Sequence, residues 1–456
     1  MTLWQYLRDK MLEHPTQIIQ EGNASTTYEE MCVFVEKFAD KLTSWSYGII
    51  CKSEMAAAMA LLACIAAGKT AIPITTRYGN DVYTRILDRS DPPYIIHDFE
   101  GELKLMSMEP KTKYRYFGKP PAVILFTSGS TGVPKGVMLS DENIMSNIEA
   151  ISSYFSIDQH DTILISRPLY HSSVLTGEFL LSLCCGAKIV FSSESFQPIN
   201  ILNLIKKHQI TIFGSTPTLL SVLSHFVRNP DVFSLKILSI SGECMTEGMA
   251  NNIRRAFPKA RVLCGYGLSE ASPRVAYLPS ELFDKYPTAA GIPLPLVQYR
   301  IVDKSDVDVG EGETGELIIN GPNVMQGYFD DKVRTRCVLK NGWLHTGDLA
   351  CKAPNGLLYI KGRKDDMIIR AGMNIYPTEI ENALSLDPRV DNVLVYRGYE
   401  NDTQQVYLTI SGDFCSVDEV IELCKQKLPA YQMPAKIKLV DKTDILDGGK
   451  KKRRVL

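Results

Sequence analysis

The apolar residues of the chain follow two patterns that alternate along most of its length. Short apolar runs at 122–126, 162–166 and 188–191 have the length of buried strands. Longer segments such as 141–155 place apolar residues three and four positions apart, as one face of a helix requires. Strands that alternate with helices predict largely parallel sheets with covered faces. We therefore expect an α/β fold.

The pattern changes towards the C-terminus. Between 291 and 359, turn signals separate short strands, which indicates a small β-rich, barrel-like subdomain. Beyond it, short strands and a helix at 417–427 predict a small α/β domain. The polar segment 100–119 is interpreted as a linker. The expected architecture is a large N-terminal domain of stacked α/β subdomains with the β-barrel-like subdomain, followed by a small mobile α/β C-terminal domain.

Composition narrows the class of protein. The 456 residues are 45% hydrophobic and 22% charged, as in a globular chain with a large core. A net charge of -2 without a basic stripe gives no case for nucleic acid, and the longest apolar run, 55–68, is too short to span a membrane. The 11 cysteines are odd in number and lack a Cys-x-x-Cys pair, which favours reduced thiols in the cytoplasm over disulfides or a zinc site.

The segment 127–136 has the composition of a phosphate-binding loop. It follows the apolar run 122–126, and its glycines let backbone N–H groups turn towards an anion while hydroxyls and Lys135 add donors and charge. It is not a Walker A loop, because no Gly-Lys-Ser/Thr opens a helix. A flexible Gly/Ser linker is the alternative, but a linker rarely has a strand on each side. The candidate residues are Thr127, Ser128, Gly129, Ser130, Thr131, Gly132 and Lys135.

Two later segments carry further candidate chemistry. In 263–270 a strand runs into Gly-Tyr-Gly, so that Tyr266 can stack on a flat ring while Glu270 can meet a phosphate and its Mg²⁺. Alone, this segment is more typical of a β-turn with a packed tyrosine. Asp348 follows a glycine and offers two acceptors, which suits the vicinal hydroxyls of a sugar, although a single Thr-Gly-Asp means little.

Together and in this order, the segments closely resemble the signature blocks of the adenylate-forming superfamily, which includes acyl-CoA and aryl-CoA synthetases, peptide-synthetase adenylation domains and luciferases. The resemblance extends from about residue 3 to residue 456, although 39–59 is shorter than the family pattern, as though a strand or turn had been removed. It implies an N-terminal adenylation domain at 1–362, a hinge at 363–366 and a mobile C-terminal domain at 367–456.

The resemblance also implies roles for single residues. Tyr266 would stack on adenine, and Asp348 and Arg363 would bind the ribose. Asp365 would be the hinge residue. Three residues would be catalytic: Lys450 as the catalytic lysine, Glu270 as the metal ligand, and His171 near the acyl carboxylate and thiol path. The remaining implied nucleotide contacts are Gly242, Glu243, Cys264, Gly267 and Ser269, and the implied acid pocket contains Ser173, Val174, Gly177 and Ser215.

The implied activity is ATP-dependent ligation of a carboxylic acid through an acyl-AMP to a thiol, with ATP, Mg²⁺ and CoA. The phosphopantetheine of an acyl or peptidyl carrier protein is the alternative acceptor, and loading of an amino acid is the alternative reaction. The rivals from other classes are a non-catalytic nucleotide-binding homologue and a nucleotide kinase, which would need a Walker A loop. Because Ser173 has no carboxylate beside it, the acid is expected to lack an α-amino group.

Overall fold

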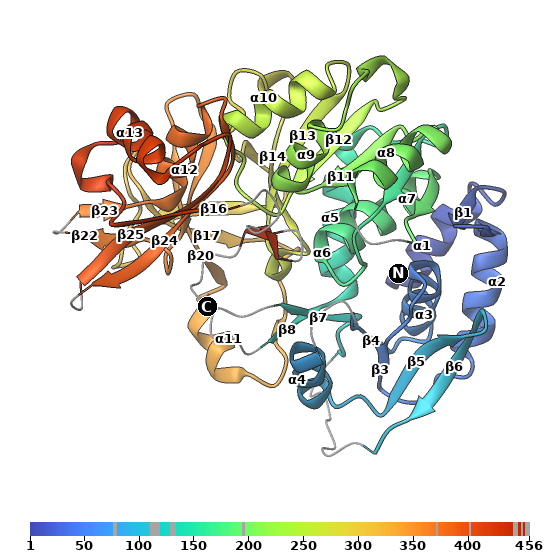
Figure 1. Ribbon diagram of the computed structural model, residues 1–456. Coiled ribbons are helices and arrows are strands. Elements are labelled where there is room, and N and C mark those ends of the chain that lie inside the picture. The colour runs from blue at the N-terminus through green and yellow to red at the C-terminus, as the bar shows by residue number, and fades with distance from the viewer. Residues whose placement is uncertain are drawn as a thin grey trace.

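Figure 1 shows a computed structural model of the protein. The structure describes residues 1–75, 80–109, 119–127, 134–193, 197–370, 373–400, 403–440, 446–447 and 450–451, with the backbone alone at 80–81, 446–447 and 450–451. The predicted phosphate-loop residues Ser128, Gly129, Ser130, Thr131 and Gly132 lie outside the described residues, as does the side chain of Lys450.

The largest sheet of the described chain has nine strands and is parallel from β13 to β1. Its antiparallel strands β14, β15 and β2 form the two edges. In spatial order the strands are β15 (Ile292–Pro293), β14 (Arg274–Leu278), β13 (Arg261–Gly267), β12 (Ile237–Ser241), β11 (Ile212–Ser215), β9 (Thr162–Ile165), β10 (Lys188–Phe191), β1 (Ile18–Glu21) and β2 (Ala24–Thr27).

A second sheet of seven described strands carries the predicted phosphate loop between β7 and β8. Its order is β18 (Gly327–Tyr328), β8 (Lys135–Leu139), β7 (Val123–Thr127), β4 (Thr70–Pro73), β3 (Ser46–Ile49), β5 (Tyr94–Phe99) and β6 (Glu102–Ser107). One expectation was wrong here. The supposed linker contains β6, an exposed edge strand whose backbone pairs with β5. The region 39–59 contains β3, which pairs in parallel with β4 and β5, and the removal of a strand or turn from this region stays a prediction.

The two sheets share one hydrophobic core, with helices between and around them. Helix α3 is apolar on all sides and contacts both β1 and β4, so it lies between the sheets (Figure 1). Helix α5 starts at a capping box, in which Ser140 and Asn143 satisfy each other's backbone N–H groups. The helices of this part are α1 (Leu3–Leu12), α2 (Tyr28–Ala39), α3 (Glu54–Ala66), α4 (Asn80–Ser90), α5 (Asp141–Phe155), α6 (Ser172–Val174), the π-helix η1 (Leu175–Leu180), α7 (Leu181–Cys185), α8 (Pro198–Lys207), α9 (Pro217–Ser224) and α10 (Glu247–Ala256).

The predicted β-rich subdomain is a third sheet, antiparallel throughout, with α11 (Lys332–Val338) inserted beside it. It contains β16 (Gln298–Val302), β17 (Gly315–Asn320), β20 (Trp343–Lys352), β19 (Leu339–Lys340) and β21 (Leu358–Arg363).

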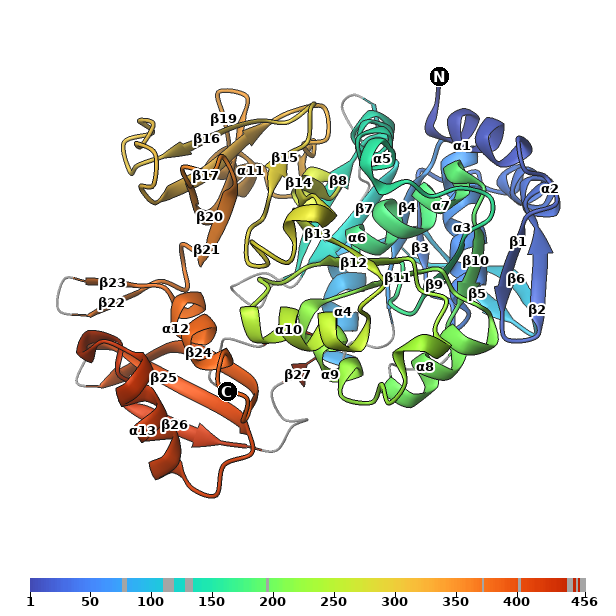
Figure 2. The same cartoon turned by 90° about the horizontal axis from the view of Figure 1, so that it is seen from above.

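The chain after β21 forms a small α/β unit with its own hydrophobic core (Figure 2). Its elements are β22 (Ile368–Arg370), β23 (Met373–Ile375), α12 (Pro377–Ser385), β24 (Val390–Glu400), β25 (Thr403–Gly412), α13 (Val417–Lys427), β26 (Lys436–Leu439), β27 (Leu446–Asp447) and β28 (Lys450–Lys451). Across the described residues, no helix has both the length and the apolar character that a membrane crossing needs.

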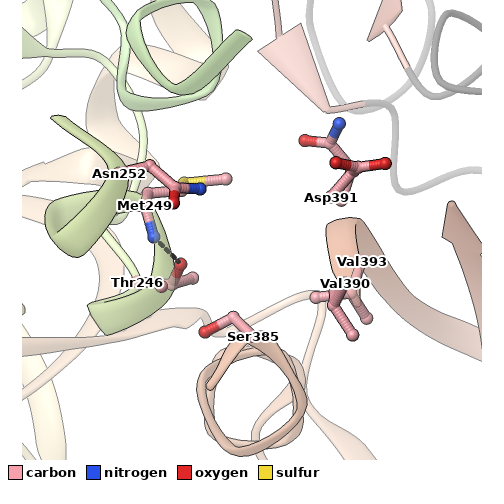
Figure 3. Close-up of a pocket in the computed structure, with 9 residues that line it drawn as sticks. Thr246, Met249, Asn252, Ser385, Val390, Asp391 and Val393 are labelled. Carbon is pink, nitrogen blue, oxygen red and sulfur yellow. Dashed lines mark hydrogen bonds between the residues drawn. The ribbon is translucent and has the colours of Figure 1, made fainter. Parts of the chain in front are cut away.

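The C-terminal unit approaches the N-terminal part at α10. Figure 3 shows a small crevice there, with Thr246 and Asn252 on one side and Ser385 and Asp391 on the other. A Cβ atom added at Gly248 would overlap with the carbonyl oxygen of Ser385. The two parts can therefore come this close only because residue 248 has no side chain.

Candidate functional site

The predicted sugar-binding pair lies on neighbouring strands of the third sheet. Asp348 on β20 and Arg363 on β21 are direct partners in the antiparallel register. The guanidinium of Arg363 donates to Asp348 Oδ1 at 2.9 Å and to the carbonyl oxygen of Thr346 at 3.0 Å. The positive φ of 73° at Gly347 lets the chain turn beside this guanidinium. The structure thus brings the two predicted residues together.

Tyr266, at the end of β13, completes this group. Its hydroxyl donates to the other oxygen of Asp348 at 2.5 Å. Burial raises the pKa of Tyr266, and the adjacent carboxylate of Asp348 raises it further. Burial also raises the pKa of Asp348, and it outweighs the opposing effect of the Arg363 charge. Both oxygens of Asp348 therefore have protein partners before any ligand binds, and each keeps one lone pair for a sugar hydroxyl.

A second cluster joins the predicted metal ligand to the predicted phosphate-loop lysine. Tyr328 on β18 donates its hydroxyl to Glu270 Oε1 at 2.8 Å. The Lys135 ammonium lies over the Tyr328 ring, 5.5 Å from its centroid. Burial lowers the pKa of Lys135, and the Glu270 carboxylate opposes that shift. Tyr328 is a site residue that the sequence interpretation missed, since nothing near it in the sequence marks it out.

This second cluster suits a magnesium nucleotide. Glu270 Oε2 makes no hydrogen bond to a described residue, so one carboxylate oxygen remains for a metal. Mg²⁺ is usually held by one or two carboxylates together with substrate phosphates. No group of three or more metal-binding side chains occurs in the part of the chain that the structure describes.

The residues expected around adenine come from neighbouring strand ends. Gly242 follows β12 with a φ of 99°, and the Glu243 carboxylate accepts from the Thr218 hydroxyl at 2.6 Å. Cys264 is buried on β13, and burial raises its pKa to about 12, so its thiol stays protonated at neutral pH. Gly267 is packed against the backbone of Pro273.

The residues expected to bind the acid lie at the turn before α6, on α6 and η1, and at the end of β11; we call this region the acid side. The ring of His171 lies 4.1 Å from that of Tyr170, centroid to centroid. The hydroxyls of Ser172 and Ser269 are 3.1 Å apart, and this contact joins the turn to the predicted metal block. The pocket candidates Ser173, Val174 and Gly177 lie on α6 and η1, and Ser215 ends β11.

Several polar atoms on the acid side lack hydrogen-bond partners among the described residues. Ser215 Oγ, Thr176 Oγ1 and one oxygen of Glu178 are buried without a partner. The other oxygen of Glu178 is bound by the guanidinium of Arg167. Arg274, on β14, is also buried. The sequence interpretation missed Arg167, Glu178 and Arg274, although a charged residue at the start of the otherwise apolar strand 274–278 is a signal that it could have used.

Asp365, the predicted hinge residue, lies just after β21. Its carbonyl oxygen accepts a hydrogen bond from the guanidinium of Arg397 in the C-terminal unit. The hinge role stays a prediction, as does the position of the domain boundary. The catalytic roles of His171, Glu270 and Lys450 also stay predictions.

Comparison with known proteins identifies CoA ligases and synthetases as similar proteins. The sequence pattern of the AMP-binding enzyme family matches residues 118–329. The chain is 27% identical to a feruloyl-CoA synthase from Amycolatopsis sp over 98% of this chain and 96% of that protein. It is 30% identical to a long-chain-fatty-acid–CoA ligase from Escherichia coli O157:H7 over 74% of this chain and 61% of that protein. The o-succinylbenzoate CoA synthetase of Bacillus subtilis, solved with its acyl-adenylate intermediate, superposes with a TM-score of 0.83 at 25% identity over 99% of this chain and 97% of that one. The same enzyme has been solved with ATP and a magnesium ion.

Proposed function

We propose that the nucleotide and acid sites of this chain lie on opposite sides of strand β13. The chain belongs to the AMP-binding enzymes of the adenylate-forming superfamily and is an AMP-forming acid–thiol ligase of the acyl- and aryl-CoA synthetase type. The observation that carries this proposal is the convergence of two clusters at the end of β13. The Glu270 carboxylate is close enough to act electrostatically on Asp348, and both carboxylates act on the guanidinium of Arg363. This arrangement suits the ribose and the phosphates of one bound nucleotide.

In the first half-reaction, a carboxylate oxygen of the acid attacks the α-phosphorus of ATP, and the bond to pyrophosphate breaks. Two anions must approach each other, so their charge has to be neutralised. Lys135, the loop 127–132 and Lys450 supply donors and positive charge. Mg²⁺ held by Glu270 would neutralise phosphate charge and orient the leaving pyrophosphate.

In the second half-reaction, the sulfur of the thiol attacks the acyl carbon, and AMP leaves with the former carboxylate oxygen. Lys450 is needed only for the first step, so rotation of the C-terminal domain about Asp365 can replace it with a path for the thiol. His171 borders that path. The acceptor is CoA, as the names of the relatives indicate, and the compartment is the cytoplasm, in agreement with the 11 free cysteines.

The experiment measures the two half-reactions separately. The variant Lys450→Ala should lose ATP–pyrophosphate exchange by about 100-fold or more, because transition-state charge is no longer neutralised. Its conversion of purified acyl-AMP to the thioester should be largely unchanged. The neighbouring Lys451→Ala serves as the matched control and should retain both activities. Normal exchange by Lys450→Ala would show that the lysine is misassigned, and Lys451 or Lys452 would be the next candidate.

The same assay distinguishes the thiol acceptors. Purified acyl-AMP is offered to the wild-type enzyme with CoA or with a phosphopantetheinylated carrier protein. Faster thioester formation with CoA supports the proposal, whereas transfer to the carrier alone would make the protein a stand-alone adenylation enzyme. The absence of exchange with any acid would indicate a non-catalytic homologue.

A further inference from the structure

Arg274 has a buried charge that the described residues do not neutralise. Only two arginines are buried among the described residues, Arg167 and Arg274, and Arg274 is 3% exposed. Arg167 is paired with the carboxylate of Glu178. The guanidinium of Arg274 makes no ion pair or hydrogen bond with any described residue, and its Nε is buried without a partner. Burying an unpaired charge is costly, so such a group normally indicates a missing anion.

The backbone of Arg274 is held firmly in place. Asn147 on α5 donates to its carbonyl oxygen at 2.8 Å and accepts from its N–H at 3.0 Å. Asn323 donates to the same carbonyl oxygen at 3.1 Å. Three side-chain hydrogen bonds thus fix the position from which the guanidinium extends, as expected for a preorganised binding group.

The guanidinium lies on the acid side of β13. A Cβ at Gly265 would overlap with its Nη1, and a Cβ at Gly177 would lie 3.5 Å from its Nη2. Gly177 is one of the predicted pocket residues on η1. The glycine on β13 therefore leaves the space that Nη1 occupies, and the glycine on η1 places no side chain beside Nη2.

The charge is too deep to serve the reacting carboxylate or the nucleotide. The backbone of Arg274 is paired with Gly267, but its tip lies beside Gly265, two residues back along β13. Two residues of a strand span roughly 7 Å, so the tip is displaced by that much along β13, away from the strand end that leads to Ser269 and Glu270. The reacting carboxylate has to meet the α-phosphate near Glu270, so Arg274 faces the far end of the acid.

We propose that the acid substrate carries a second anionic group, most simply a second carboxylate, which binds Arg274. The inference rests on the proposed function, because it concerns the acid of that reaction. Of the three buried charges on this side, Arg167 and Glu178 cancel, and the charge of Arg274 remains. An anion beside Arg274 restores neutrality and can accept two parallel hydrogen bonds from the guanidinium. An alkyl chain in the same place would leave the charge unpaired, so long-chain fatty acids fit this pocket poorly.

The test is ATP–pyrophosphate exchange with matched acids. Succinate, glutarate, adipate and isophthalate are compared with their monomethyl esters and with butyrate, valerate, hexanoate and benzoate. For at least one chain length or ring, the diacid should exceed its neutral analogues in kcat/KM by on the order of 100-fold, since a polar group left unpaired in a binding site is rejected strongly. A sulfonate-bearing acid of the preferred length shows whether any anion suffices.

Variants at the same position decide whether Arg274 is responsible. Arg274→Met should remove the preference for the diacid and leave or improve exchange with the neutral analogue, whereas Arg274→Lys should keep part of the preference. Arg254→Met, which removes a guanidinium from the surface of α10, is the matched control and should leave the preference unchanged. The melting temperature of unliganded Arg274→Met should equal or exceed that of the wild type, because an uncompensated charge is removed.

Several outcomes would overturn the inference. Exchange with neutral acids that equals or exceeds exchange with every diacid would do so while leaving the ligase assignment intact. An equal loss for diacid and neutral acid in Arg274→Met would show that the residue is structural. A lower melting temperature of that variant would reveal a counterion within the chain. The absence of exchange with every acid would instead remove the proposed function itself, and the inference with it.

Discussion

The two sides of strand β13 treat charge in opposite ways. On the nucleotide side, the buried carboxylate of Asp348 is bonded to both Tyr266 and Arg363, so the protein satisfies it without a ligand. On the acid side, Arg274 has no such partner among the described residues. Where the ligand is always the same, the protein itself can supply every hydrogen bond and opposite charge that a buried group needs. The charge of Arg274 instead remains to be paired by the substrate. Under the proposed function, the Asp348 side is preorganised for ATP and the Arg274 side holds the selectivity for the acid.

The sharpest way to extend this comparison is to remove each buried arginine in turn. Arg167→Met should lower the free energy of unfolding by about 3–5 kcal/mol, because the buried carboxylate of Glu178 loses its partner. Arg274→Met should cause no comparable loss. Urea unfolding of the unliganded proteins measures both. The double variant Arg167→Met/Glu178→Leu should recover most of the lost stability, and failure to recover would mean that packing rather than charge explains the loss.

The nucleotide side can be broken without touching acid selectivity. Asp348→Asn should raise the KM for ATP by about 10–100-fold, as expected when a charge-assisted hydrogen bond is weakened. The ratio of kcat/KM values between any two acids should not change. Steady-state kinetics at saturating acid give the first value, and competing acids give the second. Asp308→Asn, on an exposed loop of the third sheet, is the control. A shift in acid preference would contradict the separation of the two sides.

A change at the contact between α10 and the C-terminal unit should alter neither nucleotide binding nor acid selectivity. It should alter only the ratio of the rates of the two half-reactions. Alanine at Gly248 would collide with the carbonyl oxygen of Ser385, so the observed placement of that unit becomes less populated. A change of about 1.4 kcal/mol would alter the ratio of adenylation to thioester formation on the order of tenfold. Both rates are measured with one acid.

Gly310→Ala, where a Cβ meets only ordinary contacts, is the matched control for that experiment. Alanine is the better helix former, so Gly248→Ala without the collision would simply stabilise α10. An unchanged ratio of rates together with a higher melting temperature would therefore show that the contact between Gly248 and Ser385 does not influence the reaction.

The smallest expected effect concerns pH. The pKa of Asp348 is raised in the folded protein, so the folded state binds this proton more tightly than the unfolded state does. Its contribution to stability is complete below the ordinary carboxyl pKa and is lost as the pH rises through the raised value. Asp348→Asn cannot ionise and should remove this loss. The variant should therefore be the more stable protein at neutral pH without nucleotide, with the difference shrinking on acidification, as followed by melting temperature. A variant less stable than the wild type at neutral pH would contradict the direction of the shift.

Much of the fold could be predicted because hydrophobic spacing is a local property. Runs such as 122–126 and 188–191 are strands in the structure. Strand β10 is parallel to both of its neighbours, as expected, whereas β7 is parallel to β4 and antiparallel to β8. The segment 100–119, interpreted as a linker although it contains β6, was an error where burial is weak. Strand β6 has mostly exposed side chains and pairs through its backbone with β5, and its alternation of polar and apolar residues, Glu102 to Leu105, is only four residues long.

The candidate site divides in the same way. Local sequence by itself determined the residues that stand in recognisable blocks, including Tyr266, Asp348 and Arg363, because a turn, a small residue and a polar group at fixed spacing have a chemical meaning that does not depend on distant contacts. Only the tertiary structure decided which of these side chains meet, and it brought Tyr328 to Glu270 and Lys135 from a strand far along the chain. It also decided that Arg274 is buried without a side-chain partner among the described residues, because burial and pairing depend on how α5, η1 and β13 pack around one guanidinium, and no stretch of sequence records that.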